Sequence, residues 1–299
     1  MIARIALRLA RDVAAIPVTA LVVWLAVAAL PPSDQSDSKE SRSAEIAQQL
    51  RSDLGIGQPL GFLKPWRDLA SGKRLGHGPR ALDALDLARA LSGSLRIGGL
   101  ALLLALAIAA GIAALRVARS GPARLAGELL PTVAYGTPVF LVALAVAIRT
   151  GISLGDDTAS FEPTVALVVG AWPGAFLGTL LGDALRAERE RPYFAMALAK
   201  GRSPAAALLL HALPNALPTL LDAFPPVATA LLTGSFAAEK LFNVTYFGFL
   251  YVHAALERQG ALVVVATTVF AALLVAVTLV SRIARLAVDP RTRDAGEAA

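Results

Sequence analysis

The chain has 299 residues, of which 56% are hydrophobic and 17% are charged, and its net charge is +6. Soluble domains carry about a quarter charged residues, and the apolar residues here gather in runs of about 20, the length that crosses a bilayer core. This composition excludes a soluble two-domain enzyme and a disordered chain. The basic residues lie at the edges of the apolar runs and not on one face with aromatic residues, so the charge indicates membrane topology rather than nucleic-acid binding.

Six apolar runs predict an all-α polytopic membrane protein with six transmembrane helices, because each run can cross about 30 Å at about 1.5 Å per residue. Arg4, Arg8 and Arg11 precede the first run, as basic residues do in a signal peptide. That run is longer than a signal-peptide core and five more follow, so we expect it to be retained. In chain order the runs are Val13–Pro31, Ile97–Leu115, Leu129–Ile148, Pro163–Gly182, Ala216–Ala238 and Gly260–Ser281.

The distribution of Lys and Arg predicts the orientation of these helices. Fifteen of them lie in the N-terminus, in the connections after the second and fourth runs, and in the tail, against three in the short loops of the other side. Both termini are therefore expected in the cytoplasm. The resulting division is an N-terminus with the first helix at 1–31, an extracytoplasmic segment at 32–96, a five-helix core at 97–281 with a cytoplasmic connection at 183–215, and a tail at 282–299.

The extracytoplasmic segment is polar and nearly balanced in charge. It begins with the composition of a linker, and Glu45–Leu54 predicts a short amphipathic helix that ends at Gly55. A segment of about 60 residues is marginal as an independent core. We therefore expect it to lie across the outer ends of the helices.

The cytoplasmic connection has the pattern of a helix, a tight turn and a second helix. Tyr193–Lys200 are good helix formers, and Gly201 lies where a left-handed residue ends a helix. Ser203–Pro204 then supply an N-cap hydroxyl and a proline at the first helical position. The second helix, Ala205–Leu213, is expected to stop at Pro214. Four apolar side chains of the first helix are expected to face the cytosol in part and to need a partner surface: Tyr193, Phe194, Met196 and Leu198.

This connection resembles the cytoplasmic signature of the inner-membrane permeases of binding-protein-dependent ABC importers, in particular the dipeptide, oligopeptide and nickel type. That signature has a small-residue helix, a glycine, nine residues, an aliphatic or similar residue, one more residue and Leu-Pro. The positions that match it here are Ala197, Gly201, His211, Leu213 and Pro214.

The resemblance extends over nearly the whole chain in order. Within the connection, the peptide type adds a tyrosine at Tyr193, the run Ala199–Gly201 and the run His211–Leu217. Glu45–Leu60 and Asp289–Arg291 resemble the outside segment and the ending of the same subfamily. The element after the fifth span is similar at Glu239, Phe242 and Gly248.

The resemblance implies an import permease in the bacterial inner membrane that pairs with a second, homologous permease. Two cytosolic ATPase subunits would bind it, and an extracytoplasmic solute-binding protein would deliver a peptide, nickel or another small solute. Arg191–Ser203 would be the coupling helix, seated in a groove of the ATPase; the alternative is an amphipathic helix resting on membrane lipid. The residues implied in ATPase coupling are Tyr193, Ala195, Ala197, Ala199, Lys200, Gly201, His211, Leu213 and Pro214.

The chain has no G-x-x-x-x-G-K-[ST] run with which to hold nucleotide phosphates. We therefore expect a transport subunit that is not an enzyme, holds no cofactor and leaves ATP to its partners. No metal site is expected either, because the chain lacks cysteine and its three histidines lie far apart.

The fourth and fifth spans carry candidate functional residues. A stripe of small residues allows close approach between helices; we expect static packing, and the alternative is a contact that slides during transport. Pro173 and Pro225–Pro226 would break the helical hydrogen bonds, which membranes tolerate where the backbone is buried in protein or lines a cavity. The fifth span, with Asp222, Pro225 and Pro226, is therefore the candidate translocation path. The stripe consists of Gly170, Gly174, Gly178 and Gly182.

Asp222 is the one ionisable residue within the predicted spans, and it bears on the choice between an ABC permease and other membrane proteins. An aspartate in mid-membrane costs about 2.5–3.5 kcal/mol, so its side chain should face the bundle or the partner permease, either for cargo or for a structural hydrogen bond. An ion-gradient-driven secondary transporter or channel would carry several ionisable residues within its spans and symmetry between its halves. The predicted spans of this chain contain one ionisable residue, Asp222, and show no such symmetry. An intramembrane enzyme is disfavoured because no catalytic group of residues is visible.

Overall fold

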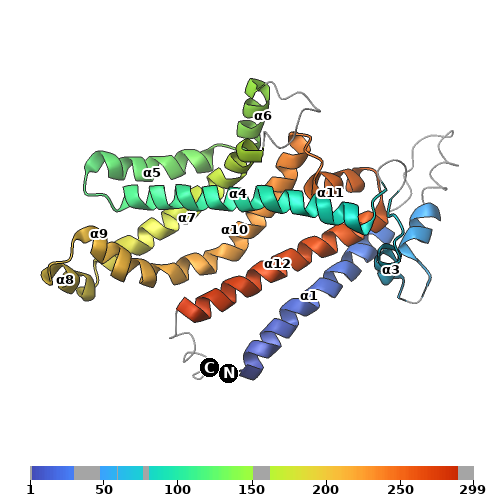
Figure 1. Cartoon of the computed structure of the whole chain (residues 1–299), viewed down its shortest axis with the longest axis horizontal. Helices are drawn as coiled ribbons and strands as arrows, with labels where there is room; N and C mark the ends of the chain where they lie inside the picture. Colours follow the sequence, from blue (N-terminus) through green and yellow to red (C-terminus); the bar gives the residue numbers. More distant parts are fainter. Residues whose placement is uncertain (1, 30–47, 59, 77–80, 151–161, 289–299) are drawn as a thin grey trace. The chain divides into compact units, whose positions relative to one another are not determined.

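The computed structural model describes residues 2–29, 48–58, 60–76, 81–150 and 162–288. Within these ranges the regular elements are helical, apart from one isolated bridge between Leu75 and Leu82. The all-α prediction is confirmed. The labelled helices (Figure 1) are α1 (Ile2–Ala28), η1 (Gly61–Leu63), α3 (Lys64–Ala70), α4 (Ala84–Arg116), α5 (Gly121–Gly136), α6 (Val139–Thr150), α7 (Glu162–Arg189), α8 (Pro192–Ala199), α9 (Pro204–Ala207), η4 (Leu208–Ala212), α10 (Leu213–Leu241), α11 (Phe247–Leu256) and α12 (Gly260–Val288).

The described helices account for five of the six predicted spans as single helices. Five stretches of the described chain are long and apolar enough to cross a membrane, and α5 with α6 forms a sixth only if the bent pair counts as one span. α4 begins 13 residues before the predicted run Ile97–Leu115, because the residues that precede this run also favour a helix. The five stretches are Ala10–Ala28, Ala84–Arg116, Glu162–Arg189, Pro204–Leu241 and Gly260–Arg285.

The third span is not the single helix that the run Leu129–Ile148 predicts. α5 and α6 meet at an angle of 84°. Thr137, between them, has an extended backbone with φ −102° and ψ 112°, because the ring of Pro138 disfavours the helical region for the residue before it. The chain resumes helical bonding when Leu141 N donates to Pro138 O at 3.0 Å.

The other prolines were expected to interrupt the helices, but the helices continue through them. α7 continues through Pro173, and α10 continues through Pro225 and Pro226. The predicted stop at Pro214 is also wrong, because the π turn η4 joins α9 directly to α10, with Leu213 N bonded to Leu208 O. The wider turn relieves the clash between a proline ring and the carbonyl four residues earlier.

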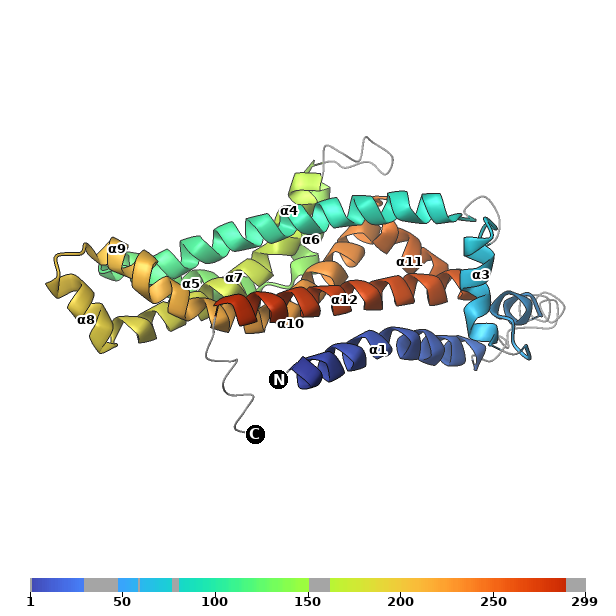
Figure 2. The same cartoon turned by 60° about the horizontal axis from the view of Figure 1, so that its bottom comes forward.

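The chain forms two compact units, of which one carries the candidate site. This unit comprises residues 95–244 and 277–299, that is, most of α4, the helices from α5 to α10, and the last part of α12. Within it, α7 and α10 pack extensively and α5 packs on α7. α8 and α9 follow from the end of α7 and lead back into α10, as both views show (Figures 1 and 2).

The other unit comprises residues 2–94 and 245–276. Residues 48–54 are helical and end at Gly55, whose φ is +62°, as predicted; residues 45–47 lie outside the described residues. Trp24 Nε1 donates to Leu54 O at 2.8 Å, and a Cβ at Gly260 would lie 2.5 Å from Leu50 Cδ1. Residues 48–54 therefore pack against the C-terminal part of α1 and the start of α12. α11 was not expected, since ten residues are too few for a span.

Candidate functional site

Local turn chemistry builds the elbow formed by α8 and α9. Arg191 has an extended backbone and Pro192 begins α8. Gly201 has φ +81°, the left-handed conformation that the sequence predicts at this helix end. Ser203 caps α9 by accepting a hydrogen bond from Ala206 N at 3.3 Å. These residues fix the angle between two short helices that could not be stable alone.

The inner face of the elbow is part of a hydrophobic core. Phe194 is 4% exposed, so the expectation that it faces solvent is wrong, and Ala197 is buried beside it. Their neighbours in the core come from five other helical segments, α4, α7, α9, η4 and α10, so α8 is packed onto the long helices. These neighbours are Ala113, Leu185, Ala207, Ala212 and Ala216, with Leu213 and Tyr193 packed at the edge.

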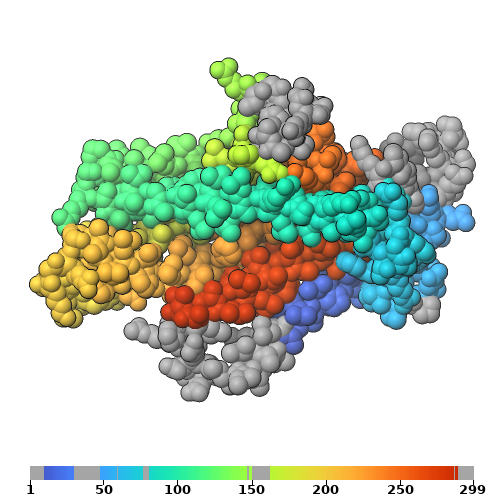
Figure 3. Space-filling model, in the orientation of Figure 1, coloured from blue at the N-terminus to red at the C-terminus, as the bar shows by residue number. Residues whose placement is uncertain are grey.

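The outer face of the elbow is uncovered. Met196 is 59% exposed although it is apolar, and Gly201 and Pro214 are also exposed. Figure 3 shows the surface of α8 and α9 in gold, with no other described element of this unit lying over it in that view. Exposed apolar groups of this kind mark contact surfaces. The exposed residues of the outer face are Ala195, Met196, Ala199, Lys200, Leu209 and Leu210.

A chain of polar contacts ties α8 to its neighbours. The Tyr193 hydroxyl donates to Glu188 Oε2 at the end of α7. Asn215 Nδ2 donates to the same hydroxyl at 3.2 Å and to His211 O at 2.9 Å. Burial raises the pKa of the Tyr193 phenol, and its bond to Glu188 raises the pKa further. The phenol therefore stays protonated, and a donor, throughout the neutral range.

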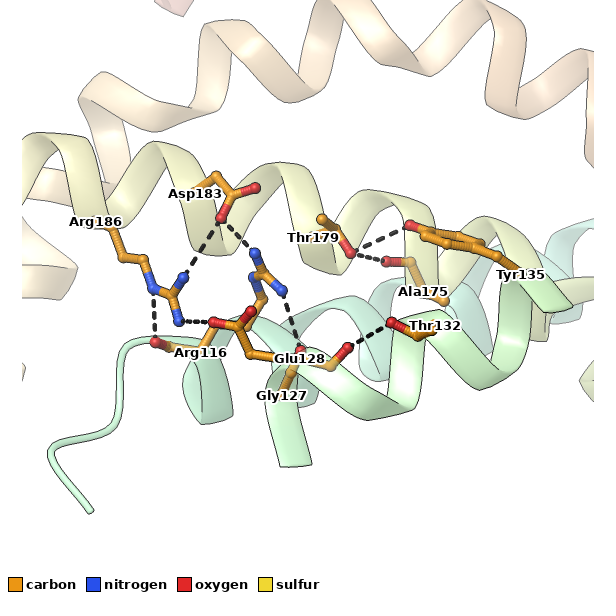
Figure 4. Close-up of polar contacts among 9 residues, drawn as sticks. All are labelled: Arg116, Gly127, Glu128, Thr132, Tyr135, Ala175, Thr179, Asp183 and Arg186. Carbon is orange, nitrogen blue, oxygen red and sulfur yellow. Dashed lines mark hydrogen bonds and ion pairs between the residues drawn. The ribbon is translucent and has the colours of Figure 1, made fainter. Parts of the chain in front are cut away.

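A second polar network joins α4, α5 and α7 just before the elbow (Figure 4). Arg116 is buried at the end of α4, where Nη2 donates to Asp183 Oδ1 at 2.6 Å and Nη1 donates to Gly127 O at 3.2 Å. Arg186 Nη2 donates to Glu128 Oε1 at 2.8 Å. Sequence reasoning counted these arginines only as topology signals, because no local pattern reveals partners 67 and 58 residues away.

The same network closes the C-terminal end of α4. The last carbonyls of a helix lack partners within the helix. Arg186 Nε donates to Arg116 O at 2.9 Å, and Arg189 Nη1 donates to Val117 O at 2.6 Å. Two side chains of α7 thus cap α4, and both lie within five residues of Arg191, the N-cap of α8.

The predicted glycine stripe of α7 packs on α4. A Cβ at Gly170 would lie 2.5 Å from Ala101 O, and one at Gly174 would lie 2.8 Å from Ala105 O. Gly178 and Gly182 meet Ala109, Ile112 and Arg116 in the same way, so the two helices run in parallel with a four-residue repeat. Ion pairs lie at both ends of this seam, with Arg96–Glu162 at 3.5 Å and Arg116–Asp183 at 2.6 Å.

Asp222 lies on α10 and forms an ion pair with Arg285 of α12. Its side chain is half exposed, and Pro225 is partly buried while Pro226 is exposed one turn further on. Among the described residues no group of three His, Asp or Glu could hold a metal ion.

The comparisons with known proteins bear mainly on residues 102–294, which include the elbow. A family model described as the binding-protein-dependent transport system inner membrane component matches residues 102–294. The chain belongs to this family. It is thus a permease subunit of an ABC importer, a multi-pass inner-membrane transport component of a kind that is not an enzyme, and the resemblance seen in the sequence is confirmed.

Relatives of this permease are named as peptide transporters. It is 28% identical to the dipeptide transport system permease protein DppB of Lactococcus lactis over 55% of the chain and 56% of the relative. It is also 28% identical to the protein of the same name from Bacillus subtilis, over 61% of the chain and 60% of the relative. The matches therefore span somewhat more than half the length of these relatives.

A solved structure shares the fold of this permease. The match covers 67% of this chain and 92% of a chain from a crystal structure of an amino acid ABC transporter with histidines, at a TM-score of 0.50 and 14% sequence identity. This likeness concerns the fold alone.

Proposed function

We propose that this permease imports peptides, and that residues 191–214 couple it to cytosolic ATPase subunits. The observation that carries the proposal is the asymmetry of α8, with Phe194 buried on the inner face and Met196 exposed on the outer face. Such a rigid, apolar protrusion suits a groove in another protein better than the lipid surface, because its inner face is already occupied by protein.

The contacts of the elbow support a coupling role. Tyr193, Glu188 and Asn215 bond α8 to the ends of α7 and α10, and Phe194 packs in the core below them. A force applied to α8 would move these helix ends with it, as a rigid-body switch requires.

The assembly that we propose contains a second permease, two ATPase subunits and an extracytoplasmic solute-binding protein. Both termini and the connection 183–215 would lie in the cytoplasm, as the count of Lys and Arg predicts. The division of the chain into an N-terminal helix (1–31), an extracytoplasmic segment (32–96), a five-helix core (97–281) and a tail (282–299) follows from the same proposed topology. ATP would bind to the partners and no cofactor to this chain.

Peptides are the proposed cargo because the relatives named above carry peptide transport in their names. Nickel, which the subfamily also includes, has no observation here that favours it. Asp222 faces Arg285, so we propose that this residue holds α10 to α12 rather than binding the cargo, while Pro225 and Pro226 remain candidates for the path.

The test is co-purification of the ATPase subunits with the permease from detergent extracts. Replacing Met196 by Glu should place a charge in the apolar contact and reduce ATPase recovery at least tenfold, since about 1.4 kcal/mol corresponds to a tenfold change in binding. Leu60→Glu is the matched control, because Leu60 is 57% exposed in the outer segment. Equal recovery with Met196→Glu, or peptide uptake by the chain alone on an ion gradient, would contradict the proposal.

A further inference from the structure

Arg186 joins α7 to two other helices at once. Its Nε donates to Arg116 O at the end of α4 at 2.9 Å, and its Nη2 donates to Glu128 Oε1 of α5 at 2.8 Å. A guanidinium can bond both acceptors because its donors are fixed in a planar fork, whereas a lysine offers a single point charge. The side chain of Arg186 is 31% exposed and that of Glu128 is 48% exposed, so their ion pair contributes little to stability. Loss of this pair should therefore leave the fold intact.

The helix ends around this contact are closely packed. A Cβ at Gly127 of α5 would lie 2.7 Å from Arg116 N, and one at Gly182 of α7 would lie 2.7 Å from Arg116 Cδ. Glycine at both positions lets α5 and α7 close on the end of α4, where Arg116 is buried. Arg116 Nη1 also donates to Gly127 O at 3.2 Å. The three helices thus meet in one cluster, which Figure 4 shows.

The elbow reaches this cluster through neighbouring residues of α7 and α4. Leu185 packs in the hydrophobic core that contains Phe194 of α8, and the next residue is Arg186. Ala113 lies in the same core, about one turn before Arg116 on α4. Among the described residues, this core contains none from α5. α5 is therefore linked to the elbow indirectly, through α4 and α7, and the bonds of Arg186 lie at that link.

We propose that Arg186 is a positioning residue that makes α5 follow the elbow during transport, through its simultaneous bonds to Arg116 O and Glu128. The inference rests on the proposed coupling role and extends it from α8 to the third span. When the ATPase subunits move α8, the ends of α7 and α4 move with it, and the fork of Arg186 carries α5 along in the same rigid-body step. α5 leads to the 84° bend at which α6 begins, so the movement reaches the middle of the predicted third span.

The test uses the complete importer in proteoliposomes and measures ATP hydrolysis and uptake of Ala-Ala-Ala in the same vesicles. Glu128→Ala removes the acceptor on α5, and Arg186→Lys keeps the positive charge but not the fork. For each variant we expect the ATP hydrolysed per peptide imported to rise about threefold, within the range usual for substitutions that change the coupling between sites. Co-purification of the ATPase subunits should be unchanged. A purely structural role would lower hydrolysis and uptake together and leave their ratio unchanged.

Arg124→Ala is the matched control. Arg124 is exposed on α5, about one turn before Glu128, and within the described ranges it forms no ion pair with α4 or α7. Its removal should therefore leave the ratio of hydrolysis to uptake at the value of the unaltered complex.

The chain has no cysteine, which allows a reversible second test. Glu128→Cys and Arg186→Cys, joined by a short bis-methanethiosulfonate linker, should restore the ratio of the unaltered complex, and reduction of the linker should raise the ratio again. Because one sample is measured before and after reduction, misfolding cannot produce the change. Glu128→Cys alone, treated with the same reagent, controls for reaction with cysteines of the partner subunits.

The outcomes separate this inference from the proposed function. An unchanged ratio in both Glu128→Ala and Arg186→Lys would overturn the role of Arg186. Equal losses of hydrolysis and uptake, with no recovery on cross-linking, would overturn it as well. Failure of the unaltered complex to import the peptide would instead overturn the proposed function.

Discussion

Arg116 Nη2 lies 2.6 Å from Asp183 Oδ1 and joins the last turn of α4 to α7. The arginine is 8% exposed, while the aspartate side chain is half exposed. The guanidinium thus reaches from a protein interior to a carboxylate at its edge, and the polar network of Figure 4 surrounds the pair. Since α8 begins nine residues after Asp183, this contact holds the base of the elbow.

Replacing Arg116 by Met should destabilise the permease by about 1–3 kcal/mol, less than for a fully buried pair because water can solvate Asp183. The substitution also removes the donor to Gly127 O. The apparent Tm in detergent measures the effect. Arg119→Met is the control, since Arg119 is exposed in the turn after α4; an equal loss in the two variants would rule out the role of the network.

The seam between α4 and α7 gives a second prediction. Gly170→Ala should destabilise by about 1–3 kcal/mol because the added Cβ meets backbone that cannot move locally, here Ala101 O at 2.5 Å. Gly111→Ala is the matched control on α4, where nothing lies within 4 Å of the new Cβ. That variant should be neutral or up to about 1 kcal/mol more stable. Similar melting curves for both alanine variants would contradict a close seam.

Tyr193 predicts an alkaline limit to the stability of the elbow. Its pKa is raised above the usual value of 10.0, first by burial and then by the bond to Glu188. A raised pKa means that its contribution is complete below the unfolded pKa and is lost as the pH rises through the folded pKa. Tyr193→Phe should therefore flatten the fall in Tm above about pH 10. A fall that is identical in both proteins would show that another group controls it.

The pair of Asp222 and Arg285 predicts an energetic coupling between α10 and α12. Each side chain is more than a third exposed, so single charge reversals, Asp222→Arg or Arg285→Asp, should each cost about 1 kcal/mol. The double reversal should restore most of the loss in Tm. Additive losses in the double variant would mean that the two charges do not interact.

The sequence predicted the elements whose signals are local. Gly201 and Ser203 have the conformations that short-range turn chemistry requires, and the long apolar helices follow from composition. Pro214 misled the prediction because a π turn, which the sequence does not signal, absorbs the proline. The 84° bend was also missed, since the length of an apolar run takes no account of the backbone at Thr137.

The candidate site was predicted only in part for a related reason. The residues of α8 were found from their spacing, but which face is buried depends on contacts with residues such as Ala113, which is remote in the sequence. The partners of Arg116 and Arg186 likewise come from three different helices. Tertiary contacts of this kind leave no periodic pattern in a single sequence.

The ion pairs at the two ends of the α4–α7 seam set a hydrophobic length. Arg96 and Arg116 are 20 residues apart on one helix, which corresponds to about 30 Å, and Glu162 and Asp183 match them on the other. Because the glycines of α7 hold it closely against α4 along the seam, we expect this spacing between the ion pairs to be kept in the membrane. The permease should therefore work best in bilayers whose acyl chains match it, since mismatch costs fractions of about 1 kcal/mol per ångström.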